Sequence, residues 1–145
     1  PTTPLSYPGV VIDDITFTFQ NRKIIELTAK KGEETIKRLI EENDGARSLG
    51  EVALVPHKTP ISLSGLTFFN TLFDENASNH LAIGQAYAFN IEKGTEMTSE
   101  ELDAAGLNRS TTHVDFMIGS DKMDIDGITA DGKTIPIFRG GEWAI

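Results

Sequence analysis

Two of the three histidines lie beside acidic residues, and these pairs are the part of the sequence best suited to chemistry. In the first pair, one residue separates His113 from Asp115. If this segment is a strand, both side chains point to the same face with their Cα atoms about 6.6 Å apart, so they can bind one metal ion or two adjacent ions. In the second, Asp74 and Glu75 are followed by His80.

Glu75 and His80 can converge only if the backbone between them is not a continuous helix. In the middle of a helix, a five-residue spacing would place the two side chains about 140° apart around the axis. We therefore expect Glu75 in a loop and His80 in the first turn of a helix capped by Asn76 or Ser78. Because the sequence has no cysteine, a metal here would need oxygen and imidazole ligands, which suit zinc and cobalt.

The same residues also have simpler explanations. A His-x-Asp pair on a strand is more often a surface pair or a hydrogen-bonded pair than a metal site. Glu51, taken alone, is a solvated end of a strand, and Tyr87 is an amphipathic residue at the edge of a core. Spacing alone does not decide between a metal site and these simpler explanations.

Hydrophobic periodicity predicts the elements of the first half of the chain. Apolar residues alternate over 10–19, which predicts a strand, and 24–29 reads as its hairpin partner. Segment 33–43 is predicted to be a helix, because apolar residues share one face and acids occupy the first turn: Ile36, Leu39 and Ile40, with Glu33 and Glu34. The short apolar run 51–55 is typical of a buried strand.

In the second half, helices are predicted from capping signals and strands from alternation. One helix is expected to run through Leu81, Ile83 and Ala86. Thr98 and Glu101 have the spacing of a capping box, and Gly106 ends that second helix. Three strand-like runs then predict an antiparallel meander: 113–118, 123–128 and 134–138. In the first of these strands, Val114 and Phe116 are expected to face the core.

Composition indicates one soluble globular domain. With 145 residues, 39% apolar and 24% charged, the chain is long enough to bury one core and has no repeat. These elements together predict an α+β fold, with a mixed, mainly antiparallel sheet and a few short helices in a single domain.

Charge and apolar runs limit the partners and the location. A net charge of −9 repels phosphate backbones and anionic lipids within a Debye length of about 10 Å, so nucleic acid and membrane are poor partners. The sequence has no apolar run long enough to cross a membrane, and residues 1–8 lack the basic and apolar regions of a signal peptide, so we expect neither. We expect a cytoplasmic protein, which the lack of cysteine also fits.

Four motifs resemble those of a known family. They are LGEVALVP (49–56), NTLFDENAS (70–78), THVDFMIG (112–119) and WAI (143–145). They look like the C-terminal part of the aminopeptidase T and aminopeptidase S (AmpS, PepS) family of dinuclear metallopeptidases, and the similarity runs over the whole chain. The resemblance implies that residues 1–145 are a C-terminal, metal-binding catalytic domain fragment of a larger peptidase.

The resemblance also implies a ligand set and a reaction. Residues that match ligands of two divalent ions, cobalt or zinc, are Glu51, Glu75, His80, His113 and Asp115. The residue that matches Tyr87 is assigned a catalytic role, and Glu75 could act as a general base as well as a ligand. The implied activity is that of a metal-dependent aminopeptidase, which removes N-terminal residues from peptide substrates through a water activated by two metals. A homodimer is expected.

One departure from the family limits what we expect of this chain. The family site includes a further glutamate from a segment that would precede Pro1. We therefore expect a truncated fragment with partial or no metal occupancy, inactive alone. The alternative is a non-catalytic module that serves dimerisation or completes the site of another domain. A calcium module is not favoured, because the acids do not follow an EF-hand pattern and fit hairpin turns: Asp121, Asp124, Asp126 and Asp131.

Overall fold

The computed structural model describes residues 1–7 and 9–145, and it confirms the α+β class. Every strand pair within these residues is antiparallel. The central sheet has the order β5-β6-β7, with strands at Leu49–Ala53, His80–Gly84 and His113–Met117. The other sheets are β1 (Leu5–Tyr7) with β2 (Val10–Ile12), β3 (Thr16–Gln20) with β4 (Lys23–Thr28), and β8 (Ile125–Ile128) with β9 (Thr134–Arg139) and β10 (Glu142–Trp143).

The helices are short, and two of them follow the sequence signals closely. They are α1 (Glu33–Glu41), α2 (Pro60–Leu63), α3 (Thr71–Asp74) and α4 (Ser99–Ala104), with 3-10 turns at Asp44–Arg47, Glu75–Ala77, Ala88–Asn90 and Gly94–Glu96. Helix α1 ends two residues before the predicted boundary. The capping box of α4 is present, since Thr98 and Glu101 each accept the other's backbone N–H. No helix in the described residues is long and apolar enough to span a bilayer.

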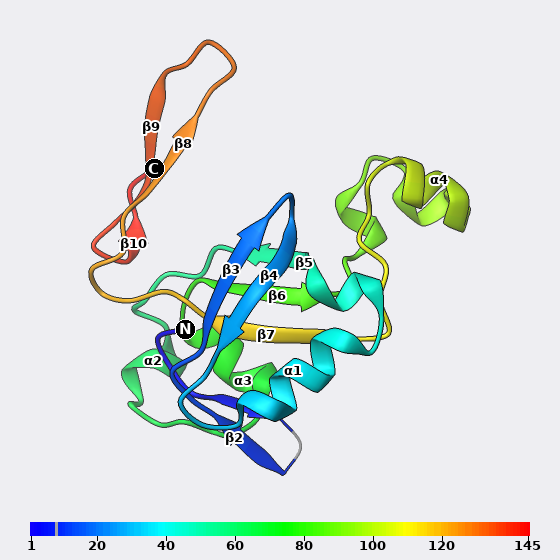
Figure 1. Ribbon diagram of the computed structural model, residues 1–145. Coiled ribbons are helices and arrows are strands. Elements are labelled where there is room, and N and C mark those ends of the chain that lie inside the picture. The colour runs from blue at the N-terminus through cyan, green and yellow to red at the C-terminus, as the bar shows by residue number, and fades with distance from the viewer. Residues whose placement is uncertain (8) are drawn as a thin grey trace.

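The hydrophobic core lies against one face of the central sheet, where the β3–β4 hairpin crosses the strands (Figure 1). The rings of Phe17 on β3 and Phe116 on β7 have centroids 5.1 Å apart. Val114 and Phe116 are both buried in this core, which confirms their predicted direction. Because side chains alternate along a strand, His113 and Asp115 must face the opposite side of the sheet.

Helix α1 closes this core with Ile36, whose side chain is fully buried. Replacing Ile36 by valine removes one methylene and leaves a small cavity, so we expect the free energy of unfolding to fall by about 0.5–1.5 kcal/mol. Ile25 on β4 is 60% exposed and serves as the matched control, because the same change there should alter stability by less than about 0.5 kcal/mol. Urea unfolding measures both; equal effects would contradict this account of α1.

The single strand predicted over 10–19 is wrong, because the chain forms two strands in different sheets. The break falls at Asp13 and Asp14, where Asp14 has a φ of 53°. The Asp13 carbonyl accepts backbone N–H groups of Lys30 and Lys31. A distant segment thus takes the hydrogen bonds that would have continued the first strand.

The helix predicted through 81–86 is also wrong, because residues 80–84 form β6. This strand lies between β5 and β7 and pairs with both. Its residues alternate: Leu81 and Ile83 pack on the core, and His80 and Ala82 face the other side. Strand pairing on both edges therefore overrides the local cap signal at Ser78.

Two other strand predictions need correction. The run 51–55 was expected to be buried, but β5 is an edge strand and Val52 is 68% exposed. The meander predicted from residue 113 is split, because β7 joins the central sheet and β8, β9 and β10 form a separate one. The β8–β9 hairpin, with its predicted turn at Asp131-Gly132, projects from the rest of the chain (Figure 1).

Candidate metal centre

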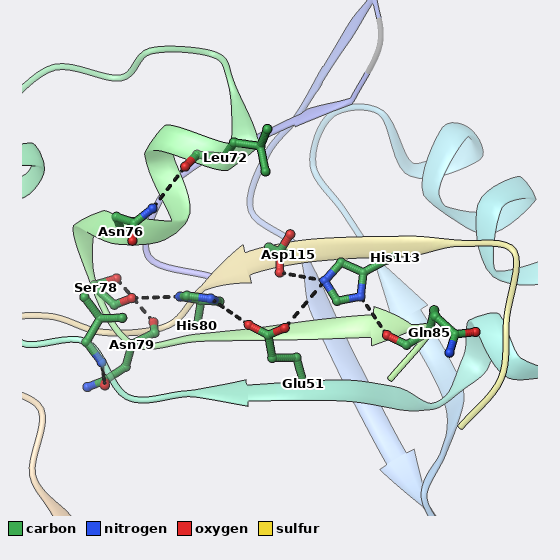
Figure 2. Close-up of polar contacts among 10 residues, drawn as sticks. Glu51, Leu72, Asn76, Ser78, Asn79, His80, Gln85, His113 and Asp115 are labelled. Atoms are coloured by element: carbon green, nitrogen blue, oxygen red, sulfur yellow. Dashed lines mark hydrogen bonds and ion pairs between the residues drawn. The ribbon is translucent and has the colours of Figure 1, made fainter. Parts of the chain in front are cut away.

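Four of the predicted ligands lie on the face of the central sheet opposite the core. Glu51 comes from β5, His80 is the first residue of β6, and His113 and Asp115 belong to β7. Figure 2 shows their side chains projecting from this face toward one another. The register explains the convergence, since Glu51 and Asp115 are both cross-strand partners of Ala82, whose methyl group leaves room above the sheet.

The carboxylate of Glu51 lies between the two imidazoles. His80 Nε2 is 3.1 Å from Glu51 Oε1, and His113 Nε2 is 3.7 Å from Glu51 Oε2. His113 Nε2 is also 3.3 Å from Asp115 Oδ1. One ligand atom each from Glu51, His80 and Asp115 lies within 4.8 Å of the others, so one metal ion could bind all three.

Glu75 joins the cluster from the 3-10 turn that precedes β6, a turn that contacts β7. The pKa of its carboxyl group is raised, first by burial and then by the negative charge of Asp115. Glu51 raises it further, and His80 acts in the opposite direction. Glu75 therefore precedes the element that carries His80, as predicted, although that element is a strand and not a helix.

Backbone carbonyls fix the orientation of both imidazoles. His80 Nδ1 lies 3.1 Å from the Ser78 carbonyl oxygen, and His113 Nδ1 lies 2.7 Å from that of Gln85. Because a carbonyl oxygen can only accept, each Nδ1 carries the proton, and in a neutral ring Nε2 keeps its lone pair. Metal-binding histidines in proteins are held in this way.

This arrangement fits a metal ion better than it fits an empty cluster. Both Nε2 atoms lie close to carboxylate oxygens, and acceptors at these distances repel unless a proton or a cation lies between them. In the described residues, Asp115 Oδ1 is a buried side-chain oxygen with no hydrogen-bond partner, although Asp115 is only 5% exposed. A divalent cation would satisfy all of these atoms, and imidazole with carboxylate is a donor set for zinc or cobalt.

Tyr87 lies beside this cluster. Its ring centroid is 5.3 Å from that of His113, and the ring also stacks on Phe89 at 5.2 Å. The side chain is 43% exposed, so it is accessible from solvent next to the candidate ligands. The structure thus brings together all six residues singled out in the sequence.

Sequence reasoning missed the groups that orient the ligands. The carbonyls of Ser78 and Gln85 flank β6, and neither depends on the identity of its side chain. Ala82, which separates Glu51 from Asp115, was read as part of a helix. No residue pattern marks a main-chain acceptor or the cross-strand partner of a residue. Only the fold could therefore reveal these two carbonyls and the place of Ala82.

Comparison with known proteins places the chain in a family that fits this centre. A family profile described as Thermophilic metalloprotease (M29) matches residues 1–143. The chain therefore belongs to the M29 metalloprotease family.

The most informative relatives are named as aminopeptidases. The chain is 63% identical over 143 residues to Aminopeptidase AmpS of Bacillus subtilis (strain 168), and 62% identical over 144 residues to Aminopeptidase PepS of Streptococcus thermophilus. A solved structure, wild-type AmpT from Thermus thermophilus, matches 99% of this chain with a TM-score of 0.91 and 46% identity. The resemblance seen in the four motifs is thereby confirmed. The chain spans about a third (35%) of the length of each of these relatives.

Proposed function

We propose that this chain supplies the metal-binding part of a metal-dependent aminopeptidase. The proposed ligands of divalent ions are Glu51, Glu75, His80, His113 and Asp115. The observation that carries the proposal is the pair of Nε2 atoms at 3.1 and 3.3 Å from carboxylate oxygens, together with an Asp115 oxygen that has no hydrogen-bond partner among the described residues. Membership in a metalloprotease family and the names of the relatives support it.

Charge balance bears on how many ions these residues can hold. Glu51, Glu75 and Asp115 supply three negative charges, whereas two divalent ions carry four positive charges and the imidazoles are neutral. The three negative charges therefore exceed the charge of one zinc or cobalt ion. They do not balance the charge of two ions held by these residues alone. We expect tight binding of one ion, weaker binding of a second, and little turnover by these 145 residues alone.

In the complete peptidase, bound divalent ions would supply Lewis acidity and an acidified water, the chemistry that hydrolyses a peptide bond. The residues of this chain would then move protons and bind charge. Glu75, close enough to Asp115 and His80 to feel the charge of both, would take a proton as a general base. The Tyr87 hydroxyl can donate a hydrogen bond to the oxygen that becomes negative when the scissile carbonyl is attacked.

A hydrolysis assay tests this function. The complete polypeptide that carries this sequence should release chromophore from an aminoacyl p-nitroanilide in the presence of cobalt or zinc, and a chelator should abolish the release. The N-acetylated form of the same substrate is the control, because an aminopeptidase requires a free amine. Cleavage of both substrates, or cleavage that a chelator leaves unchanged, would contradict the proposal.

A non-catalytic role in assembly is the second candidate, and an exposed apolar segment favours it. Five large apolar side chains from the last residue of α2 to α3 are each more than half exposed: Leu63, Leu66, Phe69, Leu72 and Phe73. Monomeric proteins rarely expose such a patch unless another protein surface covers it. A homodimer would be one such arrangement. Sedimentation of the complete polypeptide, with Leu66→Ser and Leu72→Ser together, should show a loss of association if this segment is the contact.

A further inference from the structure

The carbonyl that orients His113 belongs to a segment that Asn108 holds on both sides. The Asn108 side-chain amide donates to the Gly84 carbonyl at 2.5 Å. Its backbone carbonyl accepts the N–H of Ala86 at 2.9 Å. Between these two contacts lies Gln85, whose carbonyl accepts the Nδ1 proton of His113 at 2.7 Å.

These contacts control two consecutive peptide units. The Ala86 N–H and the Gln85 carbonyl belong to one planar unit, so fixing the N–H also fixes the direction of the carbonyl. The preceding unit joins the Gly84 carbonyl, held by Asn108, to the Gln85 N–H, which donates to the Thr112 carbonyl at 2.6 Å. Both units that meet at Gln85 are therefore tied to Asn108, and one is tied to the neighbour of His113.

Asn108 also anchors this segment to the body of the domain. Its amide donates to the Gly45 carbonyl at 2.8 Å, in the 3-10 turn after α1. Gly84 has a φ of 100°, and a Cβ there would lie 2.0 Å from the Thr112 carbonyl oxygen. Gly84 thus packs directly against the main chain of Thr112, the residue before His113.

We propose that Asn108 is a positioning residue for His113, acting through the two peptide units of Gln85. It holds the acceptor that keeps the proton on Nδ1 and the lone pair on Nε2, the atom directed at Glu51 and Asp115. Alanine at 108 keeps the main-chain carbonyl that accepts from Ala86, but without the side-chain amide this carbonyl and Gly84 are no longer tied to Gly45, so the Gln85 carbonyl shifts and His113 populates both tautomers. The consequence for metal binding rests on the proposed function, whereas the consequence for the tautomer does not.

The test compares Asn108→Ala with Asn43→Ala in the complete polypeptide. Asn43 is a matched control, because its side chain also makes three hydrogen bonds nearby, to Ala46, Thr111 and Ser110, and none of them reaches residues 84–86. Imidazole ¹⁵N shifts of the metal-free protein report the tautomer of each histidine. His80 is an internal control, since its Nδ1 bonds to Ser78.

We expect Asn108→Ala to shift His113 toward a tautomer mixture while His80 keeps the wild-type spectrum, and to weaken zinc binding by roughly 10- to 100-fold. Asn43→Ala should leave both histidines unchanged. An unchanged His113 spectrum in Asn108→Ala, or the same change in Asn43→Ala, would overturn the proposal. If Asn108→Ala does not fold, Asn108→Ser replaces it, because a hydroxyl is too short to reach both carbonyls. If the wild-type protein binds no zinc, the proposed function fails, while a selective tautomer shift still supports the positioning role.

Discussion

Replacing Asp115 by asparagine is expected to stabilise the metal-free protein and to abolish the stabilisation that zinc gives. Asp115 is buried, one of its oxygens has no hydrogen-bond partner among the described residues, and its negative charge raises the pKa of Glu75. An amide of the same shape carries no charge, and its NH₂ group can donate hydrogen bonds to the neighbouring carboxylates. The gain should be about 1–3 kcal/mol, the usual cost of an unsatisfied buried polar group.

In the presence of zinc we expect the opposite order of stability, with the wild-type protein more stable than Asp115→Asn. A ligand present at about 1,000 times its dissociation constant stabilises the folded state by about 4 kcal/mol, provided that it binds only that state. The wild-type protein should gain this amount, and Asp115→Asn should gain little. Guanidinium unfolding with and without zinc measures all four free energies.

Asp74 is the matched control for this experiment, because it is also a buried acid in the same region. Its two carboxylate oxygens accept the backbone N–H groups of Phe68 and Asn70. Asp74→Asn should therefore lose a charge-assisted hydrogen bond, destabilise the metal-free protein and keep the gain from zinc. If Asp115→Asn instead loses stability as Asp74→Asn does, or if it keeps the zinc gain, Asp115 is a structural acid and not a ligand.

Local patterns could predict part of the site because the geometry of one strand is local. The alternation of His113, Val114, Asp115 and Phe116 encodes both the buried face and the ligand face, and the structure bears out the directions of Val114 and Phe116. The convergence of Glu75 with His80 was predicted from the wrong element, since a loop before a helix and a turn before a strand can bring the same pair together.

The remainder of the site depends on contacts between distant segments. Glu51 meets Asp115 because β5 and β7 both pair with β6 in registers that align them on Ala82. No local pattern specifies those registers, so Glu51 could be singled out only from the resemblance. Edge position likewise decides that Val52 is exposed. The hydrogen bonds of Gln85 involve main-chain atoms, which any residue type could supply.

Tyr87→Phe is expected to lower kcat of the complete peptidase by about 100- to 1,000-fold, with little change in KM. The substitution removes one hydroxyl donor and keeps the ring that packs on His113 at 5.3 Å. A hydrogen bond to an oxygen that becomes negative only in the transition state stabilises that state by about 3–4 kcal/mol and adds little to substrate binding. Steady-state kinetics on an aminoacyl p-nitroanilide measures the effect.

Phe89 provides the control for this prediction, because its ring stacks on Tyr87 but carries no hydroxyl. Phe89→Leu should change kcat much less than Tyr87→Phe does. Zinc affinity should be the same in the wild type and in Tyr87→Phe, since the proposed ligand set does not include the phenol. A Tyr87→Phe enzyme with wild-type kcat would remove Tyr87 from the mechanism. A parallel loss of zinc affinity would mean that the hydroxyl supports the ligands and does not act on the substrate.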